Sequence, residues 1–181
     1  MHIGRSVRRA LFRTRSAIVM PFYRRMEASL VRRGSCVAWE QIQIYVDEEP
    51  EEHFVVETII AALELIQESD PRRMRRIQSD VKRIFVTRLG RVRGAHTPGT
   101  RDLLISASYV LRNPIVNVAF LLVHEATHVH IEQRGVSLLP DIRRRMERRC
   151  RSEEISFARK LSAERYPSLN DWIAQRQRLE A

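Results

Sequence analysis

The chain has 181 residues and a formal net charge of +10, with 44% hydrophobic and 30% charged residues. This length suits one compact domain. The hydrophobic content argues against intrinsic disorder, and no apolar run approaches the roughly 20 residues of a membrane-spanning helix. The chain has two cysteines, Cys36 and Cys150, which we interpret as reduced, buried thiols of a cytoplasmic protein.

Charge is divided into blocks along the chain. Residues 1–34 hold nine arginines against one glutamate, residues 47–70 hold nine acidic residues and no lysine or arginine, and residues 71–101 hold ten bases against one aspartate. Such blocks predict helices that face one another across the surface, or an anionic partner for the basic ones. The basic runs lack interleaved aromatic residues, which argues against nucleic acid as that partner.

Residues 1–34 are predicted to form a basic amphipathic arm, which leaves residues 35–181 as a single domain. A basic amphipathic helix can lie on an anionic membrane surface, and it would then attach the protein peripherally. One alternative is a mitochondrial-type presequence, which would look similar in a eukaryotic source. The other is a first helix that packs on its own domain through Phe12, Val19 and Phe22.

Hydrophobic periodicity and the placement of Gly and Pro predict the remaining elements. The predicted strands occupy residues 42–46, 84–87 and 102–108, with a turn-rich loop between the last two. The predicted helices occupy residues 51–67, 71–82, 113–135, 140–161 and a short segment after 167. We therefore predict an α+β fold, in which a small three-stranded sheet is packed with helices.

The helix predicted at 113–135 contains the pattern H-E-x-x-H, formed by His124, Glu125 and His128. Histidines four residues apart lie on one helix face, so both imidazoles can bind one metal ion. The carboxylate of Glu125 stands beside the first histidine, where it can take a proton from a water that the metal acidifies. Composition alone predicts only about 0.02 such patterns in a chain of this kind. The motif therefore indicates a zinc site.

A third protein ligand must come from another segment. The metzincin extension of the motif is absent, because Ile131 and Arg134 stand where its Gly and His would be. The helix predicted at 140–161 offers Glu147, Glu153 and Glu154. By three-four spacing, Glu147 and Glu154 share a stripe with apolar residues, whereas Glu153 lies on the flank and is expected to be solvated.

This arrangement resembles the gluzincin-type zinc metallopeptidases, including small bacterial zincin-like proteins, over residues 84–161. In that class a second helix supplies the third ligand in a pattern E-x-x-A, which Glu147 to Cys150 matches with Cys in place of Ala. The resemblance implies that His124, His128 and Glu147 bind zinc and that Glu125 is the general base. It makes Glu154 the acceptor of a hydrogen bond from a ligand histidine, unless the two glutamates exchange these roles.

The resemblance also implies that the strand at 102–108 is an edge strand that holds an extended peptide. Candidate donors to the transition state are His96, Tyr109 and Tyr166. His130 points away from the two motif histidines by the helical period and is excluded as a ligand. We interpret Cys150 as a packing residue.

The sequence thus predicts a zinc-dependent metallohydrolase, a small peptidase acting on a peptide or protein, with Glu125 as general base. The alternative is a catalytically inactive zincin-like protein that acts through its basic surface on a membrane or on nucleic acid.

Overall fold

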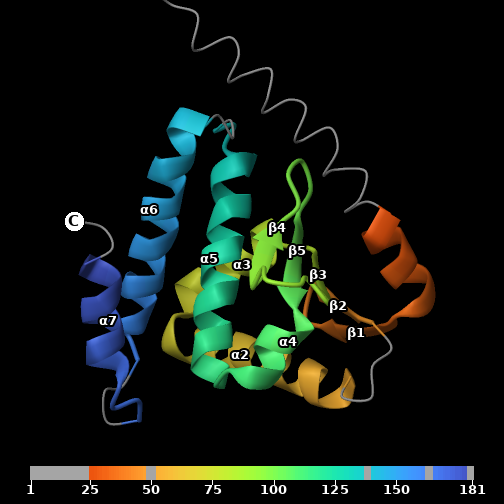
Figure 1. The fold of residues 1–181 in the computed structure, drawn as a ribbon, viewed down its shortest axis with the longest axis horizontal. Helices are drawn as coiled ribbons and strands as arrows, with labels where there is room; N and C mark the ends of the chain where they lie inside the picture. The colour runs from red at the N-terminus through yellow and green to blue at the C-terminus, as the bar shows by residue number, and fades with distance from the viewer. Residues whose placement is uncertain (1–24, 48–51, 137–139, 162–164, 179–181) are drawn as a thin grey trace, which may run out of the picture.

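The structure, a computed structural model, describes residues 25–47, 52–136, 140–161 and 165–178. These residues form an α+β fold in which helices pack around a mixed sheet (Figure 1). The strands are β1 (Ser35–Trp39), β2 (Ile42–Val46), β3 (Arg83–Thr87), β4 (Gly94–His96) and β5 (Asp102–Ser106). The labelled helices are α2 (Glu52–Ser69), α3 (Pro71–Asp80), α4 (Ala107–Arg112), α5 (Ile115–Gln133), α6 (Pro140–Ala158) and α7 (Leu169–Arg178).

The sheet has five strands in the order β1-β2-β3-β5-β4, so the prediction of three strands was wrong. The inner strands β2, β3 and β5 run parallel, and β1 and β4 pair antiparallel at the two edges. The β1–β2 hairpin turns at Glu40, which has a φ of 50°. An Asn-Gly turn would have marked this hairpin in the sequence, but here a glutamate takes the left-handed conformation.

The two faces of the sheet bury different sets of side chains, because successive residues of a strand point to opposite sides. Ile84 and Val86 of β3 belong to the large core beneath the helices, as do Leu103 and Ile105 of β5. Phe85 of β3 and Leu104 of β5 point to the other face, where they belong to a second, smaller cluster. Both central strands are therefore buried on both faces.

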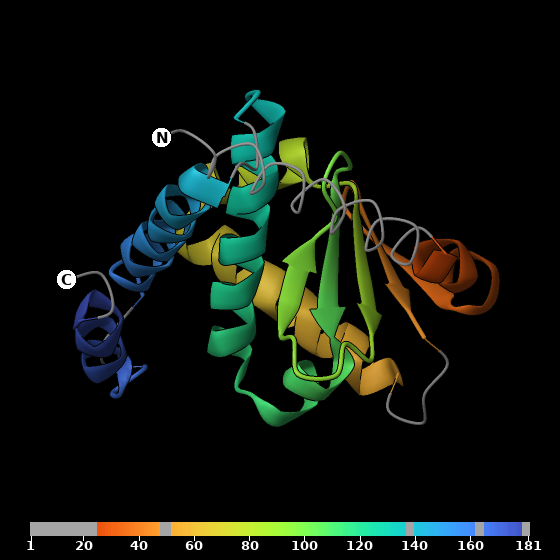
Figure 2. The ribbon, with the colours of Figure 1, turned by 45° about the horizontal axis from the view of Figure 1, so that its top comes forward.

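The large core is covered by α2 and by α5, which also packs on α6. Figures 1 and 2 show α5 standing between the sheet and α6, with α7 on the far side of α6. The helix ends follow the sequence: Asp70 caps α3 by accepting a hydrogen bond from the backbone of Arg73, and Gly135, with a φ of 78°, follows the end of α5. This arrangement places one face of α5 against α6 and another against β4.

Residues 25–33 form a helix on the side of the sheet opposite α5 (Figure 2). Its Leu30 is buried with Phe85 and Leu104 in the smaller cluster, and Met26 packs against them. The part of the predicted arm that the structure describes therefore packs on the sheet. Residues 1–24 lie outside the described residues, and so do the packing contacts predicted for Phe12, Val19 and Phe22.

A buried ion-pair network ties α3 to α6. The guanidinium of Arg73 lies 3.0 Å from the carboxylate of Asp70 and 2.5 Å from that of Glu153, and Arg76 and Arg149 also pair with Glu153. The side chain of Glu153 is 11% exposed. The expectation of a solvated Glu153 was wrong, because basic side chains from α3 reach the flank of α6. The network holds α6 in place beside the residues predicted to form the metal site.

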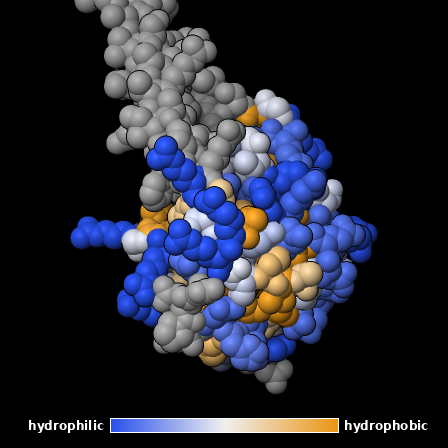
Figure 3. All heavy atoms as spheres, turned by 90° about the vertical axis from the view of Figure 1, so that its right-hand side faces the viewer, coloured by the Kyte–Doolittle hydropathy of each residue, from blue (hydrophilic) through white to orange (hydrophobic). Residues whose placement is uncertain are grey.

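The surface carries scattered hydrophobic side chains within a largely hydrophilic background, with one denser patch on the face shown in Figure 3. Among the described residues, no helix combines the length and the apolar character needed to cross a membrane.

Candidate metal centre

The site forms on α5 where the helix is most deeply buried. Apolar residues of α5 fill the core on either side of the motif, among them Val118, Leu122 and Val129. Glu125 and His128 are 6% and 7% exposed, and a polar side chain at such depth requires a partner. The helix thus carries the motif into a region where its side chains must interact with one another or with a ligand.

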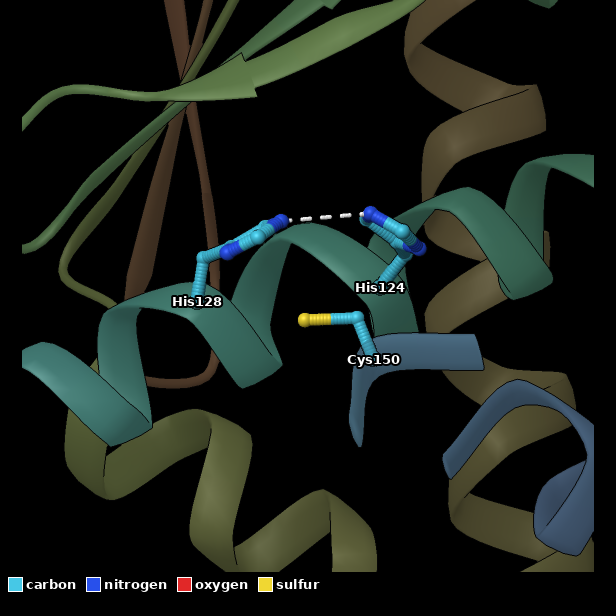
Figure 4. Close-up of side chains that lie close together, drawn as sticks. All are labelled: His124, His128 and Cys150. Atoms are coloured by element: carbon cyan, nitrogen blue, oxygen red, sulfur yellow. Dashed lines mark hydrogen bonds between the residues drawn. The ribbon is translucent and has the colours of Figure 1, made fainter. Parts of the chain in front are cut away.

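The side chains of the three predicted ligands, His124, His128 and Glu147, bring their donor atoms close together. The Nε2 atoms of His124 and His128 are 3.2 Å apart, and both point the same way from α5 (Figure 4). Of the Glu147 carboxylate on α6, Oε2 lies 3.4 Å from Nε2 of His124 and Oε1 lies 3.6 Å from Nε2 of His128. Ligands about 2.0–2.1 Å from a tetrahedral zinc ion are about 3.3 Å from one another. The three side chains therefore fit a zinc ion.

The carboxylate of Glu154 hydrogen-bonds Nδ1 of His124, on the opposite side of the ring from the Nε2 that faces Glu147. Its side chain is 3% exposed, and Arg176 of α7 lies 3.3 Å from its other oxygen. A carboxylate on the second nitrogen of a histidine fixes the ring tautomer and directs the first nitrogen at the metal. The geometry favours Glu147 as the ligand and Glu154 as the group that orients His124.

The ionisation of these groups follows from their contacts. Burial opposes a charged ring at His124, but hydrogen bonds to Glu147 and Glu154 outweigh it and raise the pKa of His124 to about 10. The hydrogen bond to His124 lowers the pKa of Glu147 to about 2. Burial, together with the neighbouring His96 and His124, lowers the pKa of His128 to about 3. The two carboxylates thus stabilise a cation at His124, which is a proton on the ring or, in its place, a metal ion on Nε2.

Glu125 lies against the edge strand β4. Its carboxylate accepts a hydrogen bond from the backbone N–H of His96, and burial raises its pKa to about 7. Gly94 makes this approach possible, because a Cβ there would lie 3.0 Å from Leu121 and 3.3 Å from the Cγ of Glu125. Glu125 therefore stands between the motif helix and a strand, with a pKa close to the range in which a general base works best.

Cys150 is also near the histidines. Its Sγ lies within 4.8 Å of a ring nitrogen of both His124 and His128, and Figure 4 shows it reaching toward α5 from α6. Cys150 is fully buried, whereas Cys36 on β1 is exposed, so the expectation of two buried thiols was wrong for Cys36. Burial raises the pKa of the Cys150 thiol, which opposes the thiolate that binds metal. Glu147 is held ionised by its contacts and is therefore the better third ligand.

The other histidines of this region, His96 and His130, lie outside the group of donor atoms formed by His124, His128 and Glu147. His96 stacks on His128 with ring centroids 4.9 Å apart, and its Nε2 is 3.6 Å from the carboxylate of Glu132. Nδ1 of His130 lies 2.6 Å from Asp80, so His130 joins α5 to the end of α3. Sequence reasoning found His96 only as a candidate donor and gave no sign of its stacking on His128.

The strand expected to hold a peptide was assigned wrongly. Asp102–Ser106 is β5, an inner strand whose two edges are paired with β3 and β4. The edge strand beside the motif helix is Gly94–His96, which lies within the segment predicted as a loop. Its outer edge is the one that faces Glu125, through the N–H of His96.

A cavity of about 580 Å³ opens at the site. His124, Glu125, Glu147 and Glu154 line it. Of the three candidate donors, Tyr109 lines it, whereas His96 and Tyr166 do not. The cavity is also lined by residues that sequence reasoning did not connect with the site, namely Arg93, Arg151, Phe120, Trp172 and Arg176.

No family model, curated protein or solved structure matches the chain. The resemblance to gluzincins therefore rests on the motif, the spacing of the glutamates and the geometry described above.

Proposed function

We propose that the protein is a zinc-dependent metallohydrolase of the gluzincin type, a small peptidase that cleaves a peptide or protein. The observation that carries the proposal is the convergence of three side chains: Nε2 of His124 and Nε2 of His128 lie 3.2 Å apart, and the two carboxylate oxygens of Glu147 lie 3.4 Å from the first and 3.6 Å from the second. Two imidazoles and one carboxylate leave a fourth position open, as in catalytic zinc sites.

When bound, zinc supplies Lewis acidity toward a peptide carbonyl and lowers the pKa of a water molecule. Glu125 then has two tasks: it takes a proton from the attacking water and passes it to the nitrogen of the leaving amine. Its burial and its hydrogen bond to the N–H of His96 hold the carboxylate in one place. Glu154 keeps His124 oriented. The outer edge of β4 runs beside Glu125, and its backbone groups other than the His96 N–H are suited to align an extended peptide there.

The test is peptide cleavage by the zinc-loaded chain, assayed on a peptide library by mass spectrometry. Glu125→Gln keeps the size of the side chain and removes its basicity. We expect this variant to bind zinc as the wild type does and to lose at least about a hundredfold in cleavage rate. Zinc-loaded wild type that cleaves no peptide would instead favour the alternative, an inactive zincin-like protein that binds partners through its basic surface.

We further propose that the protein is cytoplasmic and that the arginine-rich segment 1–34 attaches it to an anionic membrane surface. The support is the composition of that segment, which has nine arginines and one glutamate. Binding of the full chain to anionic vesicles, compared with binding to neutral ones, tests this part of the proposal.

A further inference from the structure

The cavity at the metal centre carries positive charge that peptide hydrolysis itself does not need. Arg93, Arg151 and Arg176 line it alongside three carboxylates of the site. When a divalent zinc ion is bound, the three arginines and the metal together outweigh the three carboxylates. An anionic group of a substrate would therefore enter this cavity favourably.

Of the three arginines, Arg151 is the one with a buried nitrogen that lacks a hydrogen-bond partner among the described residues. Arg176 is already engaged, because it lies 3.3 Å from Glu154 and its guanidinium lies 5.2 Å from the ring centroid of Trp172. The Nε atom of Arg151, by contrast, is buried and has no hydrogen-bond partner within the described part of the chain. A buried donor on a charged group is costly when unsatisfied. Its position on the cavity wall indicates that a ligand supplies the acceptor.

The position of Arg151 sets where this acceptor lies. Arg151 is four residues after Glu147 on α6, which is about 6 Å along the helix axis. One residue of an extended peptide spans about 3.3–3.6 Å. A group that reaches Arg151 is therefore one or two residues from a peptide bond held at the metal.

We propose that Arg151, supported by Arg93, binds a carboxylate of the substrate located one or two residues from the scissile bond. This inference rests on the proposed peptidase function. A guanidinium matches the planar carboxylate with two parallel hydrogen bonds, which a lysine cannot provide. Arg93 adds a second cation on the same cavity, where its guanidinium lies 5.8 Å from the ring centroid of Tyr109. The carboxylate comes from the peptide C-terminus or from an aspartate or glutamate side chain.

The experiment uses short peptide hydroxamates as probes, because a hydroxamate anchors to zinc and no turnover is needed. One pair ends in a free carboxylate or in a carboxamide, and a second pair carries Glu or Gln beside the hydroxamate, with the C-terminus amidated. Isothermal titration calorimetry measures their affinities for the zinc-loaded full chain. We expect at least one carboxylate probe to bind about tenfold or more tightly than its neutral twin. The pair that shows the preference identifies the source of the carboxylate.

Variants assign the preference to Arg151. Arg151→Gln is expected to abolish most of it while binding the neutral probes as the wild type does, and Arg151→Lys is expected to keep part of it. Arg148→Gln is the matched control, because Arg148 is an exposed arginine of the same helix that does not line the cavity; it should keep the full preference.

The outcomes separate this inference from the proposed function. Equal binding of charged and neutral probes by the wild type would overturn the inference and leave the zinc centre in place. A preference that persists in Arg151→Gln would overturn the assignment to Arg151. A zinc-loaded protein that binds no hydroxamate at all would overturn the proposed function, and this inference with it.

Discussion

Removing the guanidinium of Arg73 tests whether the ion-pair network holds α6 beside the metal centre. Arg73 is 6% exposed, and its two carboxylate partners, Asp70 and Glu153, have side chains 4% and 11% exposed. Replacing one member of a buried network leaves its partners desolvated and costs about 3–5 kcal/mol. Asp70 keeps Lys160, and Glu153 keeps Arg76. We therefore expect Arg73→Met to lose about 3 kcal/mol, near the lower end of that range.

Chemical denaturation followed by circular dichroism measures this loss. For a domain of this size about 3 kcal/mol corresponds to a fall in Tm of roughly 6–12 °C. Arg75→Met is the matched control, because Arg75 is an exposed arginine of the same helix, and it should change stability by less than about 0.5 kcal/mol.

A double variant separates the ion pair from general loss of packing. The double variant Arg73→Met with Glu153→Met removes both charges of this ion pair, so neither one remains buried without the other. The double variant should therefore be about 1–3 kcal/mol more stable than the sum of the single effects predicts. An Arg73→Met protein within about 1 kcal/mol of the wild type would refute the reasoning, and so would strictly additive effects of the two substitutions.

Three further predictions concern the site and its supports. Glu154→Gln should weaken zinc affinity about 10–100-fold without unfolding the protein, because His124 loses the carboxylate that orients it; competition with a chromophoric chelator measures this, and unchanged affinity would contradict it. Gly94→Val should lower peptide cleavage more than zinc binding, since its Cβ would crowd Glu125; equal loss of both would argue against the proposed contact. Stability should fall as the pH drops below about 4. Burial opposes ionisation of Asp70, but hydrogen bonds from Lys160 and Arg73 outweigh it and lower the pKa of Asp70 in the folded protein. The stabilisation from Asp70 is therefore complete above its unfolded-state pKa and is lost as the pH falls through its folded-state pKa. Asp70→Asn should flatten this acid limb in a pH series of unfolding curves, and an unchanged limb would exclude Asp70 as its cause.

The sequence predicted best those helices and strands that neighbouring residues mark, by alternating hydrophobicity or by a capping residue. The alternation of Ile42, Ile44 and Val46 predicted β2 to the residue, and Asp70 and Pro71 marked the start of α3. The strands β1 and β4 were missed for different reasons. β1 is an edge strand with partly exposed residues, and its hairpin lacks a turn signal. β4 has three residues and exists only through pairing with β5, which is a long-range interaction that no local window contains.

Local spacing likewise predicts some residues of the candidate site, whereas others reach it only through the tertiary packing. The motif spacing places both histidines on one face of α5, and three-four spacing places Glu147 and Glu154 on one face of α6, so these residues could be found from the sequence. Arg151 is four residues after Glu147, so the same spacing could also have predicted from the sequence that Arg151 lies on this face of α6. Arg93 and Arg176 reach the cavity from a loop and from another helix, and only the packing of α6 against α5 and α7 brings them together.

The most direct test of the zinc centre is elemental analysis of the chelator-free purified chain and of three variants, His128→Ala, Glu147→Ala and Glu154→Ala. Cys150→Ser serves as a control for the nearby thiol. We expect about one zinc per chain in the wild type, loss of the metal in His128→Ala and Glu147→Ala, and retention in Glu154→Ala and Cys150→Ser at saturating zinc. A folded wild type without zinc after the metal is added back would contradict the proposed zinc centre, and so would loss of zinc in Cys150→Ser with retention in Glu147→Ala.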